Sequence, residues 1–226
     1  MTTPDPHDAP AAGSGRGRVV LVVVVVAALA VGALVGALLA RQPALTAAAD
    51  GSVDAGFARD MAAHHAQAVE LSVLVRDRST DEEVRTVALD ILLTQQNQIG
   101  QMAGWLSTWG LPAAASAPPM AWMTGDHAHA TAGASGGGAT GYAAMPGWVP
   151  REDMLRLTDA TGSDADRLFL QLMIPHHEGG VQMAEYAVEH AQRPQVVALA
   201  ENIVRSQDRE LVALQAMLDA RGGPLP

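Results

Sequence analysis

The chain has 226 residues, a net charge of −10 and no cysteine, and only 4% of its residues are aromatic. An acidic chain without a basic cluster argues against nucleic-acid binding, and the lack of cysteine excludes disulfides, thiolate metal sites and cysteine nucleophiles. Abundant Ala, Leu, Val and Met with few aromatic residues favour packed helices over a β-sandwich.

The first predicted element is an uncharged run of 22 residues, 19–40. It is long enough to cross a membrane as a helix and longer than the apolar part of a usual signal peptide, so we expect a retained anchor, with a cleaved signal as the alternative. Residues 1–18 are polar and predict a disordered tail. Arg16 and Arg18 precede the run and only Arg41 follows closely, which predicts a cytoplasmic N-terminus and an extracytoplasmic C-terminal domain, secreted if the signal is cleaved.

Four helices are predicted beyond this run, because apolar residues recur there at helical spacing. We expect them to run from about Val53 to Arg76, from Ser79–Glu83 to Trp109, from Ser163 or Asp164 to His190, and from Pro194 to Asp219. The predicted segments are a tether (41–52), a first helical hairpin (53–110), a Gly-, Ala-, Met- and His-rich linker (111–150) and a second helical hairpin (151–222). Two hairpins with one broad apolar stripe each can bury those stripes against each other, which predicts an all-α four-helix bundle.

The two hairpins are copies of one unit. The pattern F-x3-M-x2-H-H begins at Phe57 and again at Phe169, 112 residues later. At the same offset the chain repeats further residues: Val69/Val181, Val84/Val196, Ala88/Ala200, Ile91/Ile203 and Gln95/Gln207. Self-similarity over this length indicates a duplicated structural unit.

The repeated Met and His residues predict a metal site. Residues three or four positions apart lie on one face of a helix, so each Met projects between the two imidazoles that follow it. The candidate ligands are Met61, His64 and His65, then Met173, His176 and His177, with Met183 as an outer ligand. If the hairpins pair, up to four imidazoles and two thioethers can meet in one pocket, with one imidazole of each pair facing inward and the other toward a groove. Thioether and imidazole suit Cu(I), and imidazole also binds divalent ions such as Zn(II) and Ni(II).

The second copy differs from the first around its histidines. Pro175 stands inside the predicted helix and should kink it at the motif. Gly179 and Gly180 replace Gln67 and Ala68 of the first copy, and such small residues allow a partner helix or a ligand to come close.

The linker contains a second Met/His group. Met120, Met123, His127, His129 and Met145 are spread over this Gly-rich segment. Flexible Met/His segments can capture soft copper ions, although composition alone leaves the linker's participation open.

Enzyme motifs are missing from the sequence. It has no paired Glu-x2-His motif of a di-iron bundle, no H-E-x-x-H, no G-x-S-x-G and no phosphate-binding loop, so we expect no enzymatic activity. The alternative to metal binding is a non-metal helical interaction module of the cell envelope, in which the His pairs form a buried hydrogen-bond network. That alternative requires a partner for every buried ring nitrogen.

The same motifs resemble the domain-of-unknown-function family numbered 305. F-x3-M-x2-H-H, then M-P-G, then F-L-x2-M-I-P-H-H-E-G-x2-Q-M-A cover about residues 53–222. The resemblance implies a ferritin-like four-helix bundle that is exported or membrane-anchored, with copper binding and copper tolerance in some members. Its motif residues are matched here by Met61, His64, His65, Met173, His176, His177 and Met183. Trp148 stands after Gly147, where another Met is expected, so one candidate ligand is missing.

Together these observations predict a membrane-anchored extracytoplasmic protein that binds copper, with Cu(I) favoured, and sequesters or delivers it. The predicted partners are the metal ion and the membrane, contacted through residues 19–40. No protein partner is indicated.

Overall fold

The structure, a computed structural model, describes residues 15–40, 47–123 and 140–226. It divides into two units, Met1–Thr46 and Ala47–Pro226. Over the described residues the regular secondary structure is helical and no strand occurs, as the composition predicted.

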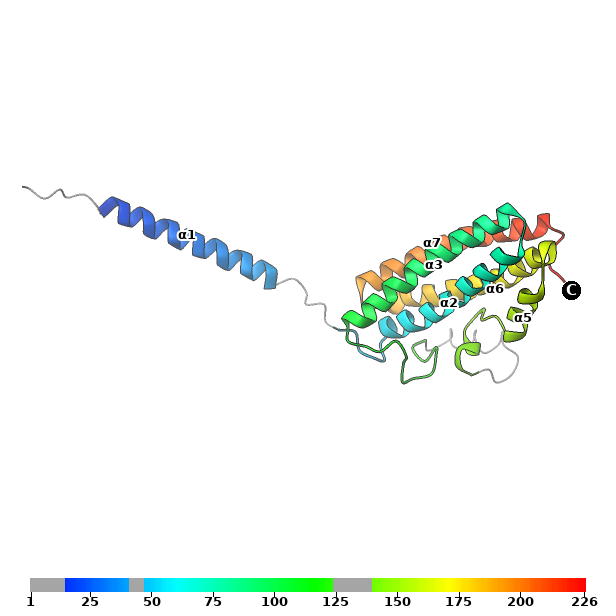
Figure 1. The fold of residues 1–226 in the computed structure, drawn as a ribbon. Helices are drawn as coiled ribbons and strands as arrows, with labels where there is room; N and C mark the ends of the chain where they lie inside the picture. Colours follow the sequence, from blue (N-terminus) through cyan, green and yellow to red (C-terminus); the bar gives the residue numbers. More distant parts are fainter. Residues whose placement is uncertain (1–14, 41–46, 124–139) are drawn as a thin grey trace, which may run out of the picture. The chain divides into compact units, whose positions relative to one another are not determined.

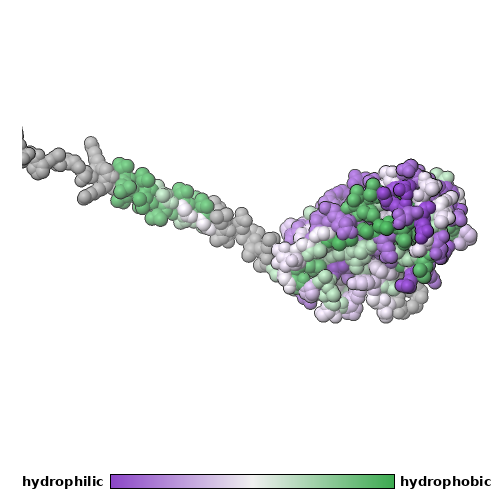
Figure 2. Space-filling view, in the orientation of Figure 1, coloured by the Kyte–Doolittle hydropathy of each residue, from purple (hydrophilic) through white to green (hydrophobic). Residues whose placement is uncertain are grey.

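The first unit contains helix α1, Gly15–Ala40. Its large apolar side chains between Val19 and Val35 are all exposed, and they form the hydrophobic surface seen in Figure 2. Within the described residues, Val19–Ala37 is the one stretch long and apolar enough to cross a membrane. Length and apolar composition are shared by membrane spans and by signal sequences.

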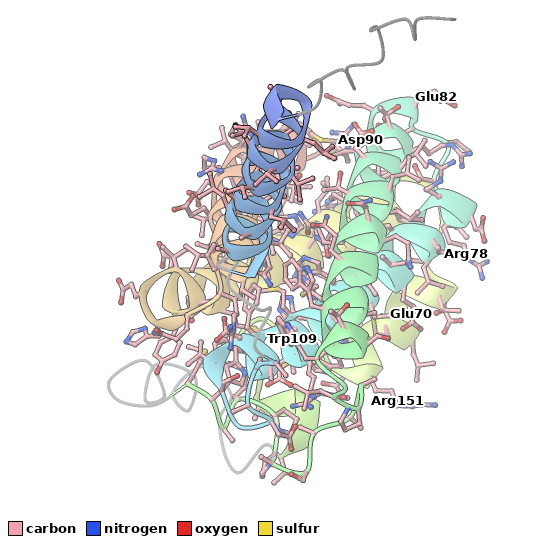
Figure 3. The ribbon with its side chains drawn as sticks, turned by 90° about the vertical axis from the view of Figure 1, so that its left-hand side faces the viewer. Glu70, Arg78, Glu82, Asp90, Trp109 and Arg151 are labelled. Carbon is pink, nitrogen blue, oxygen red and sulfur yellow. The ribbon has the colours of Figure 1, made fainter. Side chains whose placement is uncertain are left out.

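The second unit is a four-helix bundle, which confirms the predicted fold (Figure 1). Helix α2 (Val53–Arg78) pairs with α3 (Glu82–Thr108), helix α6 (Gly162–His190) pairs with α7 (Pro194–Ala220), and α2 packs against α6. Before the second hairpin lie the short helix η1 (Gly141–Ala144) and helix α5 (Arg151–Asp159), which packs on α2 and α6. Charged side chains such as Glu70, Glu82 and Arg151 are exposed on the outside of the bundle (Figure 3).

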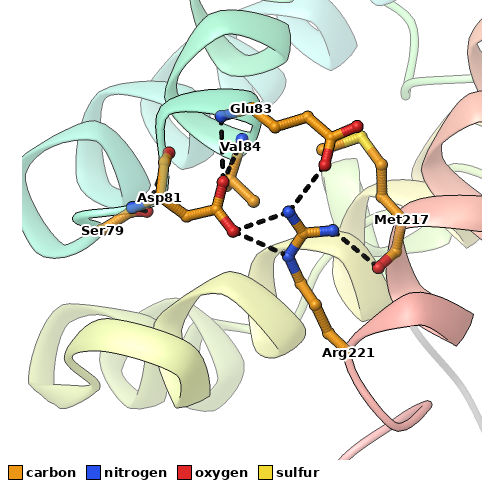
Figure 4. Close-up of polar contacts among 6 residues, drawn as sticks. All are labelled: Ser79, Asp81, Glu83, Val84, Met217 and Arg221. Atoms are coloured by element: carbon orange, nitrogen blue, oxygen red, sulfur yellow. Dashed lines mark hydrogen bonds and ion pairs between the residues drawn. The ribbon is translucent and has the colours of Figure 1, made fainter.

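Polar side chains hold the helix ends in place. Asp81 accepts hydrogen bonds from the backbone N–H groups of Glu83 and Val84, and so caps α3. Arg221, just beyond α7, donates to Asp81 over 2.6 Å and to Glu83 over 2.9 Å, and also to the carbonyl of Met217 (Figure 4). This group ties the end of α7 to the beginning of α3.

The bundle core consists of two apolar clusters. The first apolar cluster includes Phe57, Met61, Met102, Trp122, Met183 and Ile203. The second apolar cluster includes Leu71, Ile91, Phe169, Met173, Leu214 and Met217. Each of the four long helices contributes to both clusters, and the stretch between its two contributions carries polar residues. The core is therefore interrupted at mid-length.

Candidate metal site

Between the apolar clusters lies a layer of polar side chains, two from each bundle helix. We call it the central polar layer; its members are His64, His65, Gln95, Gln98, His176, His177, Gln207 and Glu210. The four histidines are fully buried, the three glutamines are at most 7% exposed, and the side chain of Glu210 is 27% exposed. The last four members stand 112 residues after the first four, so the duplication builds the layer.

The imidazoles face in two directions. His64 and His176 stack on each other, with ring centroids 3.8 Å apart. His65 turns to α3, where its Nε2 lies 2.7 Å from Oε1 of Gln98. His177 turns to α7, where its Nε2 lies 2.7 Å from Oε2 of Glu210. The expected divergence within each His pair is present, but neither ring of a pair is exposed because α3 and α7 cover the outer ones.

Hydrogen bonding defines which nitrogen carries the proton. Nε2 of His64 lies 3.1 Å from the carbonyl oxygen of Pro146, so His64, like His65 and His177, meets an oxygen that can only accept. In its neutral form each of these rings donates from Nε2, which leaves a lone pair on Nδ1. Those three Nδ1 atoms are buried and have no hydrogen-bond partner, and His176 has none at either nitrogen.

Unpartnered polar atoms concentrate in this layer. Among the described residues, nine buried side-chain nitrogen and oxygen atoms without a hydrogen-bond partner belong to the four histidines and to Gln95 and Gln207. An unpaired buried polar group costs about 1–3 kcal/mol, and native proteins contain few of them. Such a concentration at one level of the core is typical of a site that receives an ion or water.

Burial keeps these imidazoles neutral. Desolvation is the main cause that lowers the pKa of His64 to about 4 and the pKa of His65 to about 3. The pKa of His176 is also well below its usual range, again chiefly because of desolvation and then because of the neighbouring His64. A neutral imidazole is the form that binds a metal ion, so these rings are available as ligands without first losing a proton.

A segment of the linker closes one side of the layer. We call Met145–Val149 the strap. Three hydrogen bonds join it to α2: the carbonyl of Pro146 bonds His64, and the backbone N–H and carbonyl of Val149 both bond the side-chain amide of Gln67. Gly147 has φ +69°, and a Cβ there would lie 2.2 Å from the carbonyl oxygen of Pro175. A Cβ on Gly179 would lie 2.1 Å from the carbonyl oxygen of Pro146. The close approach predicted at Gly179 and Gly180 is present, but the strap is the neighbour at Gly179, while α7 is the neighbour at Gly180 through Gln207.

The candidate thioethers do not share one position with the imidazoles. Met61 and Met183 belong to the first apolar cluster and Met173 to the second, all three fully buried. Met61 and Met173 thus lie on opposite sides of the central polar layer. The arrangement differs from a single pocket of four imidazoles and two thioethers, because the repeat-related helices α2 and α6 are antiparallel. Among the described residues, no three His, Asp or Glu side chains already converge as a metal site.

The linker's Met/His group is only partly described. Met123 and Met145 are buried, and Asp60 accepts hydrogen bonds from the backbone N–H of Met120 and from Nε1 of Trp122, next to Met123 in the chain. His127 and His129 lie outside the described residues. The described methionines of this group therefore pack against the bundle.

Sequence reasoning did not identify Gln98 and Glu210. Each bonds the second histidine of its own copy across 33 residues of chain. Adding the repeat offset of 112 to Gln98 yields Glu210, so the duplication contained the signal.

The chain is similar to known proteins in sequence and in fold. A family model described as a domain of unknown function, DUF305, matches residues 54–218. The structure is similar to a DUF305 protein of Streptomyces coelicolor described as secreted, with 43% identity and a TM-score of 0.68 over 79% of this chain and 99% of that one. A DUF305 fragment from Deinococcus radiodurans has 31% identity and a TM-score of 0.59, over 77% of this chain and 99% of that one.

More distant proteins share the fold or part of the sequence. CopM in its Cu(I)-bound form has 23% identity and a TM-score of 0.54, over 74% of this chain and 96% of that one. Its Cu(II)-bound form has 24% identity and a TM-score of 0.52, over 73% and 94%. An uncharacterized mimivirus protein, L153 of Acanthamoeba polyphaga mimivirus, is 34% identical over 56 residues. That match covers 25% of this chain and spans only 37% of the relative's length.

Proposed function

The chain belongs to the DUF305 family, and we propose that it binds copper in the central polar layer of an extracytoplasmic bundle. The role is to hold or pass on the ion, without catalysis. The observation that carries the proposal is the set of buried, unpartnered Nδ1 atoms on His64, His65 and His177, together with both free nitrogens of His176. Buried imidazole nitrogens that lack hydrogen-bond partners and lie at one level of the core are suited to a metal ion.

Copper is favoured over other ions by the chemistry around the layer. Fully buried thioethers, Met61 on one side and Met173 on the other, provide a soft and apolar environment that favours Cu(I). The fold is shared with CopM, which has been solved with Cu(I) and with Cu(II). At 23–24% identity this likeness extends to the fold, so it supports copper only as the first ion to test.

The test is thermal unfolding of the full chain in detergent, without metal and with Cu(I), Cu(II), Zn(II) or Ni(II). A ligand at about 100 times its dissociation constant stabilises the native state by about 2.7 kcal/mol, which for a chain of this size corresponds to roughly 5–10 °C. We expect this increase with Cu(I). It should disappear when His176 and His177 are both replaced by alanine and persist in His190→Ala, because His190 lies outside the layer.

The alternative is a helical interaction module in which the histidines are structural, and the three Nε2 hydrogen bonds favour it.

Circular dichroism, which measures helicity and stability, separates the two functions. A metal site predicts that the double alanine variant keeps its helicity and loses the metal-dependent increase. A structural network predicts lower stability in the variant with or without metal. An increase with Zn(II) or Ni(II) alone would retain the site and exclude copper, and no increase with any ion would reject metal binding.

We also propose that α1 anchors the bundle outside the membrane, with its N-terminus in the cytoplasm, because Arg16 and Arg18 closely precede the apolar run and only Arg41 closely follows it. The chain has no cysteine, so single cysteines can report topology without background. In intact cells a membrane-impermeant maleimide should label Ser107→Cys, and Thr3→Cys only after lysis. The opposite labelling would reject this orientation, and release of the bundle into the medium would indicate a cleaved signal.

A further inference from the structure

Glu210 and Gln98 make the same contact in the two copies of the repeat. Each bonds Nε2 of a fully buried histidine, and each heavy-atom distance is 2.7 Å. The two residues are 112 positions apart, as are their histidines. They differ in charge, because Gln98 is a neutral amide and Glu210 is a carboxylate. The first copy thus shows that a glutamine can hold this histidine in the same way.

Glu210 is the charged member of the central polar layer. The other members are four histidines and three glutamines, and none of these side chains carries a negative charge. A cation placed among these side chains therefore has one carboxylate in the layer to balance it. A buried charge without a counter-charge is strongly unfavourable, so the number of carboxylates limits the ion charge that the layer can accept.

We propose that Glu210 is the positioning residue and counter-charge of the site, and that its single negative charge selects a singly charged ion. This inference rests on the proposed metal-binding function. The carboxylate holds the ring of His177 with Nε2 protonated and raises the electron density at the free Nδ1. One carboxylate neutralises Cu(I) or Ag(I) but leaves Zn(II) with an uncompensated charge. In the first copy Gln98 orients His65 and offsets no charge, so the two halves of the site are unequal.

The experiment exchanges the two acceptors in the full chain in detergent. Affinities for Ag(I), a redox-stable substitute for Cu(I), and for Zn(II) are measured by competition with chromophoric chelators. Glu210→Gln should weaken Ag(I) binding by about 10–100-fold, the usual effect of losing such an outer partner. Gln98→Glu should raise the affinity for Zn(II) more than that for Ag(I). The double exchange, Gln98→Glu with Glu210→Gln, should restore Ag(I) binding because the carboxylate reappears at the equivalent position.

Two controls separate this role from a structural one. Asp208→Asn removes one negative charge from an exposed position of the same helix and should leave Ag(I) affinity unchanged. The metal-free stability of Glu210→Gln should stay near that of the unmodified chain, because glutamine accepts the same hydrogen bond in the first copy. Equal Ag(I) affinities in the unmodified chain and Glu210→Gln would overturn the proposal, as would a double exchange that restores nothing. If the unmodified chain binds no ion at all, metal binding itself fails; if it binds and the exchanges change nothing, only this inference fails.

Discussion

His64 stacks on His176 across the α2–α6 interface, with the ring centroids 3.8 Å apart and the ring planes 28° apart. The two residues occupy the same position in the two copies of the repeat. A contact between equivalent residues lies close to the axis that relates the copies. These two imidazoles therefore belong equally to both hairpins, and an ion bound by them would link the copies.

Acid is expected to destabilise the metal-free protein. The pKa values of His64 and His65 are lowered from 6.5 to about 4 and about 3 by burial. Between those values and 6.5 the unfolded chain binds protons that the native bundle rejects, so stability is complete above pH 6.5 and is lost as the pH falls. Each histidine should contribute a loss of about 1.4 kcal/mol per pH unit over that interval. Urea unfolding between pH 7 and pH 4.5 measures the loss, and a flat profile would show that the rings are protonated without cost.

Alanine at Gly179 is expected to destabilise the bundle by displacing the strap. The added Cβ would lie 2.1 Å from the carbonyl oxygen of Pro146, and backbone must move to relieve that contact. Overpacking of this kind costs about 1–3 kcal/mol. Gly100→Ala is the matched control, because a Cβ there meets nothing within 4 Å and alanine favours the helix by roughly 0.5–1 kcal/mol. The free energy of unfolding, measured with denaturant, should thus fall in Gly179→Ala and rise in Gly100→Ala. Similar changes in both variants would refute the close packing of the strap.

Replacing Arg221 by alanine is expected to loosen the joint between α7 and α3. Its guanidinium side chain is 13% exposed and bonds Asp81 and Glu83, whose side chains are 33% and 68% exposed, so its removal breaks two ion pairs between α7 and α3. We expect a loss of about 1 kcal/mol in the free energy of unfolding, less at high salt because the partner carboxylates are more exposed. The exposed Arg209→Ala should stay within about 0.5 kcal/mol of the unmodified chain. Equal losses in both variants would deny Arg221 a specific role.

Methionine at Gln207 is expected to stabilise the metal-free protein. The amide of Gln207 is 2% exposed and neither of its polar atoms has a hydrogen-bond partner. An apolar side chain of similar size removes that unpaired group, which should raise the free energy of unfolding by about 1 kcal/mol. The same change at the exposed Gln96 is the control and should have little effect. Lower stability in Gln207→Met would show that ordered water satisfies the amide.

The helices were predictable because their signals are local. Periodic apolar residues predicted the helix that begins at Val53, and the structure extends it two residues beyond the expected Arg76. Pro194 stands at the first position of α7, as its chemistry requires. The duplicated Phe, Met and His pattern likewise identified the four histidines that the bundle buries.

Tertiary structure alone decided how those histidines are used. The partners of His65 and His177 are 33 residues away along the chain, and the strap reaches His64 across 82 residues, distances over which helical periodicity carries no information. Antiparallel packing of α2 and α6 placed Met61 and Met173 on opposite sides of the layer. The sequence by itself determined which residues are helical and which face they occupy, because those properties depend on neighbours within one or two turns. Which buried polar atoms meet depends on the pairing of distant helices, and only the folded bundle determines that.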